Sequence, residues 1–304
     1  MRRDFVLCGL LALAACSSDR GRAGSGTARM VKTEELPPEQ RSVLEAWRAG
    51  GSAWESERER VRADPRLAQF LVDNLIVQMV RSFDRSELGS ALRLQSPFAR
   101  AQAELVRLPE ASVPVLVELL GVKDDIVAFL SADTLKRIGA PAVDPVASKL
   151  AAPEPEVRRR IAELLEALPD SATDEPALLE KLGAAVERDE AWIVRAQAAR
   201  ALGARASHRT QRGYAAAVLG RALSDPDPAV QTSALGALGS LGEAAAVPAL
   251  IRRLERAASD GDLRALQASQ AALRRLSGES RDHDPEGWWA IWNQRGRPAD
   301  PSPR

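Results

Sequence analysis

At 304 residues with 45% hydrophobic side chains, the chain is long enough to bury the core of one large domain or two ordinary ones. Aromatic residues make up only 4% of it, whereas alanine, leucine and arginine occur throughout, a composition that favours an all-α fold over a β-sheet protein. The formal net charge is zero, so no field of the whole molecule would attract nucleic acid, and we expect no nucleic-acid partner.

The first 16 residues have the pattern of a secretory signal peptide. Arg2 and Arg3 precede an apolar run from Phe5 to Ala15 that is too short to cross the roughly 30 Å of hydrocarbon in a bilayer. The run ends in Leu-Ala-Ala-Cys, which resembles the lipobox of bacterial lipoproteins. That resemblance implies that the Cys16 thiol receives a diacylglyceryl group before the preceding peptide is removed. We expect ordinary secretion rather than twin-arginine export, because the arginine pair follows the initiator methionine directly.

A lipid on Cys16 would decide both the redox chemistry and the location of the protein. Removal of the segment that holds Cys8 would leave one cysteine, capped by lipid, so we expect no disulfide and no thiol catalyst. Several acyl chains such as palmitate on one residue anchor a protein stably, at about 0.8 kcal/mol per buried methylene. Ser17 and Ser18 resemble the outer-membrane sorting signal of enteric lipoproteins. We therefore expect a membrane anchor in the cell envelope, and an outer membrane position facing the periplasm is favoured.

The next two segments are a tether and an N-terminal cap. Residues 17–35, rich in Gly, Ser, Arg and Thr, cannot bury enough apolar surface to fold and predict a flexible tether on the order of 25 Å long. We expect residues 36–95 to form a helical cap, in which one or two longer helices cover Pro37 to Phe83. Trp47 and Trp54 lie seven positions apart and would share one helix face.

Prolines ahead of apolar stretches reveal a repeat. They are Pro114, Pro145, Pro176 and Pro248, at intervals of 31, 31 and 72 residues. The last interval is two periods of 36, so we expect one degenerate unit near Arg212 to Tyr214. Proline suits the first turn of a helix, where its missing N–H costs nothing. The predicted second helices of the units end near Leu120, Leu150, Leu182 and Leu254.

A different pattern precedes these prolines and predicts the first helices of the units. Val157-Arg158, Val194-Arg195 and Val230-Gln231 begin similar segments spaced by 37 and 36 residues. Glycines follow the last periodic residues and predict left-handed helix ends at Gly139, Gly203 and Gly239. The segment 225–228, Asp-Pro-Asp-Pro, predicts a helix start. A pair of short helices cannot bury its apolar face alone, so the units must stack.

These units resemble HEAT-like repeats of the short bacterial type, which also occur in phycobilisome lyase subunits, over roughly residues 97–294. The resemblance implies an α-solenoid of stacked antiparallel helix pairs, with atypical helical caps at both ends. We place the repeat array at 96–262, a terminal helix and Trp-rich cap at 263–295 and a disordered tail at 296–304. In that cap, Trp288, Trp289 and Trp292 could present a stacking surface, although the favoured interpretation is that they plug the end of the last repeat.

No set of residues predicts catalysis. His208 and His283 are about 75 residues apart, and neither begins the His-Glu pair of the metal-binding HEAT-repeat hydroxylases. The sequence has no phosphate-binding Gly-Lys-Ser/Thr loop and no nucleophile elbow. Acidic pairs such as Asp189 and Glu190 are interpreted as salt-bridge partners of arginine on solvated helix faces. We therefore expect no enzyme, no cofactor and no metal.

Arginine is the residue type that could recognise a partner. If equivalent helices lie side by side, their arginines would form a basic ridge able to hold an acidic protein or anionic polymer by bidentate pairs. The other interpretation is a solvated face with intramolecular ion pairs. Aromatic residues of the degenerate unit could add contacts if they are exposed. The candidate partner-binding residues are Arg158, Arg159, Arg195, Arg200, Trp192 and Tyr214.

The sequence favours a non-catalytic, lipid-anchored envelope scaffold or adaptor that binds a protein or peptide partner through the solenoid surface. Two alternatives stay open. One is a lyase- or chaperone-like factor for a cofactor-bearing protein, suggested by the resemblance to phycobilisome lyase repeats. The other is a protein that binds the cell wall or a polysaccharide through arginine and tryptophan.

Overall fold

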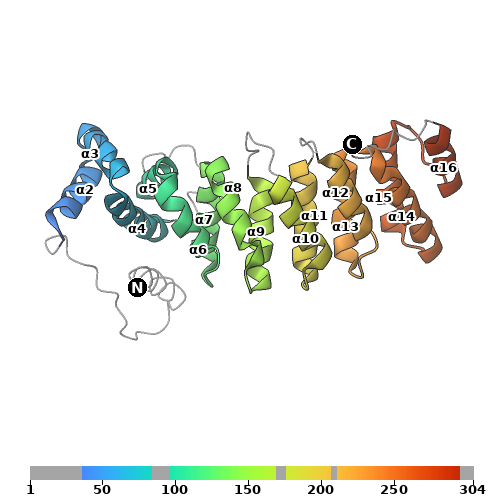
Figure 1. Ribbon diagram of the computed structural model, residues 1–304, viewed down its shortest axis with the longest axis horizontal. Helices are drawn as coiled ribbons and strands as arrows, with labels where there is room; N and C mark the ends of the chain where they lie inside the picture. The colour runs from blue at the N-terminus through green and yellow to red at the C-terminus, as the bar shows by residue number, and fades with distance from the viewer. Residues whose placement is uncertain (1–35, 84–95, 169–175, 207–210, 295–304) are drawn as a thin grey trace. The chain divides into compact units, whose positions relative to one another are not determined.

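The computed structural model describes residues 36–83, 96–168, 176–206 and 211–294, and among these it contains helices and no strand (Figure 1). The chain forms two compact units, Met1–Pro145 and Val146–Arg304, called unit 1 and unit 2 below. The predicted signal peptide, Cys16, the tether, His208 and the C-terminal tail lie outside the described residues. None of the described helices is both long enough and apolar enough to cross a membrane.

Unit 1 is built from helices that pack on their neighbours in the chain, with α4 on α5 and α6, and α5 and α6 on α7. In chain order they are α2 (Pro38–Ala49), α3 (Gly51–Ala63), α4 (Pro65–Ser82), α5 (Pro97–Arg107), α6 (Pro109–Leu119), α7 (Asp125–Ile138), the 3-10 turn η4 (Ala140–Ala142) and α8 (Val143–Ser148), which continues into unit 2.

The prediction of one or two long helices over 37–83 is wrong, because the described range contains α2, α3 and α4. The first break is at Gly50 and Gly51, whose φ angles of 70° and 57° turn the chain where residues with a side chain would be strained. Trp47 and Trp54 consequently lie on different helices, and their rings meet edge to face with centroids 5.3 Å apart.

Unit 2 consists of two rows of helices, as expected for stacked helix pairs. The first helices of successive pairs form one row, α9, α11, α13 and α15, and the second helices α10, α12 and α14 form the other. The elements are η5 (Lys149–Ala151), α9 (Pro155–Ala167), α10 (Pro176–Arg188), α11 (Trp192–Ala206), α12 (Arg212–Ala222), α13 (Pro228–Leu241), η6 (Ala244–Ala246), α14 (Val247–Asp260), α15 (Leu263–Ser277) and α16 (Pro285–Gln294). The expected all-α solenoid of stacked helix pairs is confirmed.

Several predicted helix ends are wrong. Pro114 lies inside α6, which begins at Pro109, and the second helices α10 and α14 continue past their predicted ends to Arg188 and Asp260. Gly139 does end α7, with a φ of 78°. Local periodicity predicted these boundaries poorly because packing along the whole helix sets its length.

Gly203 and Gly239 were also predicted as helix ends, and this is wrong because they lie inside α11 and α13. Gly203 is required by the packing between helices, whereas a Cβ atom on Gly239 would lie at an ordinary contact distance of 3.5 Å from the Cβ of Ala272. A Cβ atom on Gly203 would lie 2.6 Å from the Cβ of Ala237, so the missing side chain lets α11 and α13 approach closely. The left-handed end of α13 is Gly242 instead, with φ 71° and ψ 19°.

The last helix, α16, packs on α14. Trp288 is 1% exposed, and its Nε1 donates a hydrogen bond of 2.6 Å to Oε1 of Gln270 on α15. The ring of His283 meets that of Trp288 edge to face, with centroids 4.9 Å apart. Trp288 therefore belongs to the core of unit 2 and offers no stacking surface to a ligand.

Candidate functional site

The first helices of unit 2 begin along one edge. Their starts at Pro155, Trp192, Pro228 and Leu263 repeat at intervals of 37, 36 and 35 residues. We call this row the ladder edge and define it as residues 152–158, 189–195, 225–231 and 262–264. Its polar groups repeat with the same period, and ion pairs connect the starts of α9, α11 and α13.

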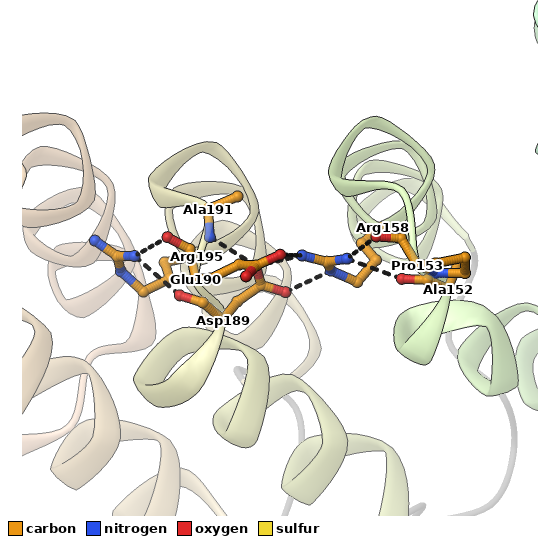
Figure 2. Close-up of polar contacts among 7 residues, drawn as sticks. All are labelled: Ala152, Pro153, Arg158, Asp189, Glu190, Ala191 and Arg195. Carbon is orange, nitrogen blue, oxygen red and sulfur yellow. Dashed lines mark hydrogen bonds and ion pairs between the residues drawn. The ribbon is translucent and has the colours of Figure 1, made fainter.

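The first connection is a buried ion pair between α9 and the segment before α11. Arg158 donates from Nε to Oδ2 of Asp189 at 2.7 Å and from Nη2 to Oδ1 at 2.8 Å. Its remaining Nη1 donates to the carbonyl oxygens of Ala152 and Pro153, both at 2.8 Å (Figure 2). The two side chains of the pair are 10% and 8% exposed.

The second connection repeats this geometry one unit further along. Arg195 donates from Nε and Nη2 to the two carboxylate oxygens of Asp225, at 2.8 and 2.9 Å. Its Nη1 donates to the carbonyl oxygens of Asp189 and Glu190, at 2.9 and 3.2 Å. Figure 2 shows how residues 189–191 therefore receive one guanidinium group on each side. Each arginine therefore connects the segment that precedes its own helix to the segment that precedes the next first helix.

The electrostatics of these pairs favour the charged forms of Arg158, Arg195 and Asp225. Burial alone would raise the pKa of the Asp225 carboxyl, but the hydrogen bonds from Arg195 and from the Asp227 amide, with the charge of Arg195, outweigh burial and lower that pKa. The hydrogen bond to Asp189 raises the pKa of Arg158, and the hydrogen bond to Asp225 raises that of Arg195. Bidentate, charge-assisted bonds of this kind fix geometry as well as contributing energy.

The third position of the ladder is different, because Gln231 stands where the first two units have arginine. Gln231 keeps the bond to the backbone, since its Nε2 donates to the carbonyl oxygen of Asp225 at 2.7 Å. The next acidic residue, Asp262, takes its cation from the second-helix row instead, at 3.1 Å from Nη2 of Arg253.

Large apolar side chains are exposed at the same edge. Trp192 is 47% exposed, its neighbour Ile193 36% and Leu263 71%. Pro155 and Pro228 occupy the equivalent positions on α9 and α13 and are exposed too. Single exposed apolar residues are ordinary, but here they recur at successive helix starts, and buried ion pairs hold the starts of α9, α11 and α13 in register.

The predicted arginines do not form a ridge of free guanidinium groups. Arg158 and Arg195 are the ladder residues described above. Arg159 pairs along α9 with Glu156 and Glu163, at 2.8 and 2.7 Å. Whether any of these arginines contacts a partner stays a prediction.

Arg200 and the two predicted aromatic residues lie apart from one another. Arg200 hydrogen-bonds Gln197 on its own helix and lies 3.6 Å from Glu166 of α9. Tyr214 is 37% exposed and lies on α12, which starts shortly after α11 ends. Because α11 has 15 residues, Trp192 at its start and Tyr214 beyond its end are roughly 20 Å apart.

Sequence reasoning missed the acidic half of the ladder. Asp189 was assigned to a solvated face, whereas its side chain is 8% exposed. Asp225 was interpreted only as part of a helix start. The available signal was spacing, because an aspartate follows Arg158 by 31 residues and Arg195 by 30. Within the described ranges, no group of three or more His, Cys, Asp or Glu residues could hold a metal ion.

Comparisons with known proteins agree with this architecture. Residues 179–274 match the family model of HEAT repeats, and this match includes α11 and α13 in full. No curated protein matches the chain.

Solved structures similar to this chain have low identity to it. An engineered protein is 20% identical, with 67% of this chain and 96% of that chain covered and a TM-score of 0.42. The complex of CpcE and CpcF of phycocyanin lyase from Nostoc sp. PCC7120 is 24% identical, with 54% and 98% covered and a TM-score of 0.39. Computationally designed armadillo repeat proteins for modular peptide recognition are 19% identical, with 66% and 98% covered and a TM-score of 0.38.

Proposed function

We propose that this chain is a lipid-anchored scaffold of the cell envelope that binds a protein or peptide partner along the ladder edge of unit 2 and catalyses no reaction. One observation carries the proposal: Trp192 and Ile193 are exposed at a helix start that buried Arg–Asp pairs hold in place, and Leu263 is exposed at the equivalent start of α15. Stacked helix pairs present long surfaces of this kind, and repeat proteins use such surfaces for binding.

The buried pairs give the edge a fixed geometry before any partner arrives. Binding loses free energy when side chains and loops must be ordered, so a surface that is already ordered binds more tightly for the same contacts. Tryptophan is one of the side chains enriched among the residues that dominate binding energy. Trp192 is therefore the residue that we expect to contribute most to the interface.

Photo-crosslinking tests the surface. A photoreactive amino acid in place of Trp192 should capture one partner reproducibly from intact cells. The same amino acid in place of Tyr214, which is similarly exposed on α12, is the matched control and should not capture that partner. Equal labelling from the two positions, or none from either, would contradict binding at the ladder edge.

The anchor is tested separately, because its support is the sequence pattern around Cys16. The wild-type chain should incorporate labelled palmitate and sediment with membranes. Cys16→Ser should lose the label and leave the membrane pellet, since the cysteine of the predicted lipobox is gone. A wild-type chain that takes up no label would remove the lipoprotein part of the proposal and leave the binding surface in place.

A further inference from the structure

The third position of the ladder leaves space between two helices. In the described part of the chain, Gln231 makes no hydrogen bond to Asp262, although Arg158 and Arg195 each bind the equivalent aspartate. A pocket of about 310 Å³ is lined by both Gln231 and Asp262. An arginine at position 231 would have reached Asp262 across this space. This volume is at the lower end of that of ligand-binding pockets.

A buried cation lines this pocket with one N–H unused. The side chain of Arg253 is 9% exposed, and its Nη2 lies 3.1 Å from Oδ2 of Asp262. Its Nε is buried and has no hydrogen-bond partner. A buried N–H without an acceptor is unfavourable, so the protein leaves the hydrogen-bonding capacity of the Arg253 guanidinium group incompletely satisfied.

The charges of the residues that line the pocket favour a negatively charged ligand. Arg253 and Arg264 line it, against the single carboxylate of Asp262. Asp262 is already engaged, because Oδ1 accepts from the amide of Ala265 at 3.0 Å and Oδ2 faces Arg253. Arg264 makes no ion pair with any described residue and is exposed. A cation entering the pocket would meet two guanidinium groups, whereas an anion would find them incompletely neutralised.

We propose that this pocket binds a carboxylate group, which Arg253 and Arg264 hold while Pro228 and Leu235 pack against the apolar stem that carries it. The pocket lies at the ladder edge, since Pro228, Asp262 and Arg264 belong to that edge and line the pocket. The inference rests on the proposed function only for where the carboxylate comes from. If the partner is a polypeptide, the carboxylate belongs either to an acidic side chain or to the C-terminus of that partner.

Sodium propionate is the first probe, because it is a carboxylate on a short apolar stem. The full chain in detergent micelles, labelled with 15N-arginine, should show a saturable shift of the Arg253 Nε–H resonance with propionate and none with equal sodium chloride. Propylguanidinium chloride should not produce the shift. A shift with propylguanidinium, or none with propionate, would overturn the assignment.

Two variants close the pocket by different means. Gln231→Arg should supply the missing ladder side chain, and Ala268→Leu should fill the pocket from α15 without adding charge. Each should weaken propionate binding at least tenfold, and because they act independently, one remains informative if the other fails to fold. If either variant folds and binds propionate as tightly as wild type, propionate binds at another place on the protein and the proposed site is refuted.

A pair of exposed arginines supplies the matched control. Arg264→Gln should weaken binding severalfold, whereas Arg252→Gln, on exposed α14 surface outside the pocket lining, should leave it unchanged. Equal weakening by both would show that propionate responds to general surface charge, which contradicts the proposal.

Tripeptides identify the source of the carboxylate. An amidated peptide with a central glutamate tests the side chain, and an acetylated trialanine with a free C-terminus tests the terminal carboxylate; the one that competes with propionate is the source. If neither competes, the pocket does not receive a polypeptide carboxylate. The result is independent of crosslinking at Trp192, so failure of this site and failure of the proposed function can be told apart.

Discussion

Replacing Arg195 by glutamine tests whether the ladder holds unit 2 together. The substitution removes two charge-assisted hydrogen bonds to Asp225 and leaves a carboxylate that is 10% exposed without its cation. The chain already contains this arrangement at Gln231, where a glutamine keeps only the bond to a backbone carbonyl. The variant should therefore fold but be less stable.

The magnitude follows from the burial of the pair. Breaking a buried ion pair by removing one partner costs about 3–5 kcal/mol. Here the glutamine can keep one carbonyl bond and the Asp227 amide still donates to Asp225, so we expect a loss of about 2–3 kcal/mol. Arg159→Gln removes ion pairs to exposed glutamates on the same face of α9 and should cost less than about 1 kcal/mol.

Urea unfolding followed by circular dichroism measures these losses, and hydrogen exchange over α11 and α13 shows where they occur. A double-mutant cycle with Asp225→Asn isolates the pair, and the coupling energy should be at least about 1.5 kcal/mol. If the two single effects add within about 0.5 kcal/mol, the residues do not stabilise each other and the argument for a rigid ladder edge fails.

Further predictions concern pH and helix packing. Because the folded state lowers the pKa of Asp225, the stability from its pair with Arg195 is present above about pH 4 and is lost as pH falls through the folded value, so wild type and Arg195→Gln should converge in acid unfolding experiments. Burial raises the pKa of Asp73 to about 6 against the opposing hydrogen bond from Gln69, so the folded state binds the proton more tightly and stability falls as pH rises from about 4 to about 6. Asp73→Asn should be more stable than wild type at pH 7 and should lose this slope; an unchanged slope would assign it to another group. Gly203→Ala should destabilise unit 2 by about 1–3 kcal/mol, because its Cβ would lie 2.6 Å from that of Ala237. Gly236→Ala, which meets nothing within 4 Å, should stabilise α13 by about 0.5–1 kcal/mol, and equal melting temperatures for the two variants would contradict the packing argument.

Much of the fold could be predicted because its signals are local. Proline fixes its own φ angle and lacks an N–H, which favours the first turn of a helix, and the predicted helix starts at Pro176 and Pro228 are confirmed. The repeat period follows from the same residues, since each unit must place equivalent groups in equivalent positions. Composition and period together were enough to predict stacked helix pairs.

Other local signals were ambiguous. A glycine after a periodic leucine fits a helix end, but it equally fits a close approach between helices, and only the position of Ala237 on α13 shows that Gly203 serves the second purpose. Pro114 fits a first helical turn, but Pro109 fits one as well, and α6 begins at Pro109. For Gly203 the deciding neighbour is distant in the sequence.

The sequence by itself determined the helical class, the period and the arginine at position 195, because these depend on residue type and spacing along the chain. Only the tertiary structure decided that this arginine reaches Asp225, 30 residues away, and that Gln231 in the next unit leaves a pocket beside Arg253. The physical reason is that burial and pairing depend on which helices stack on one another. The energy of an ion pair depends on the distance between its charges in space and not on the number of residues between them in the sequence.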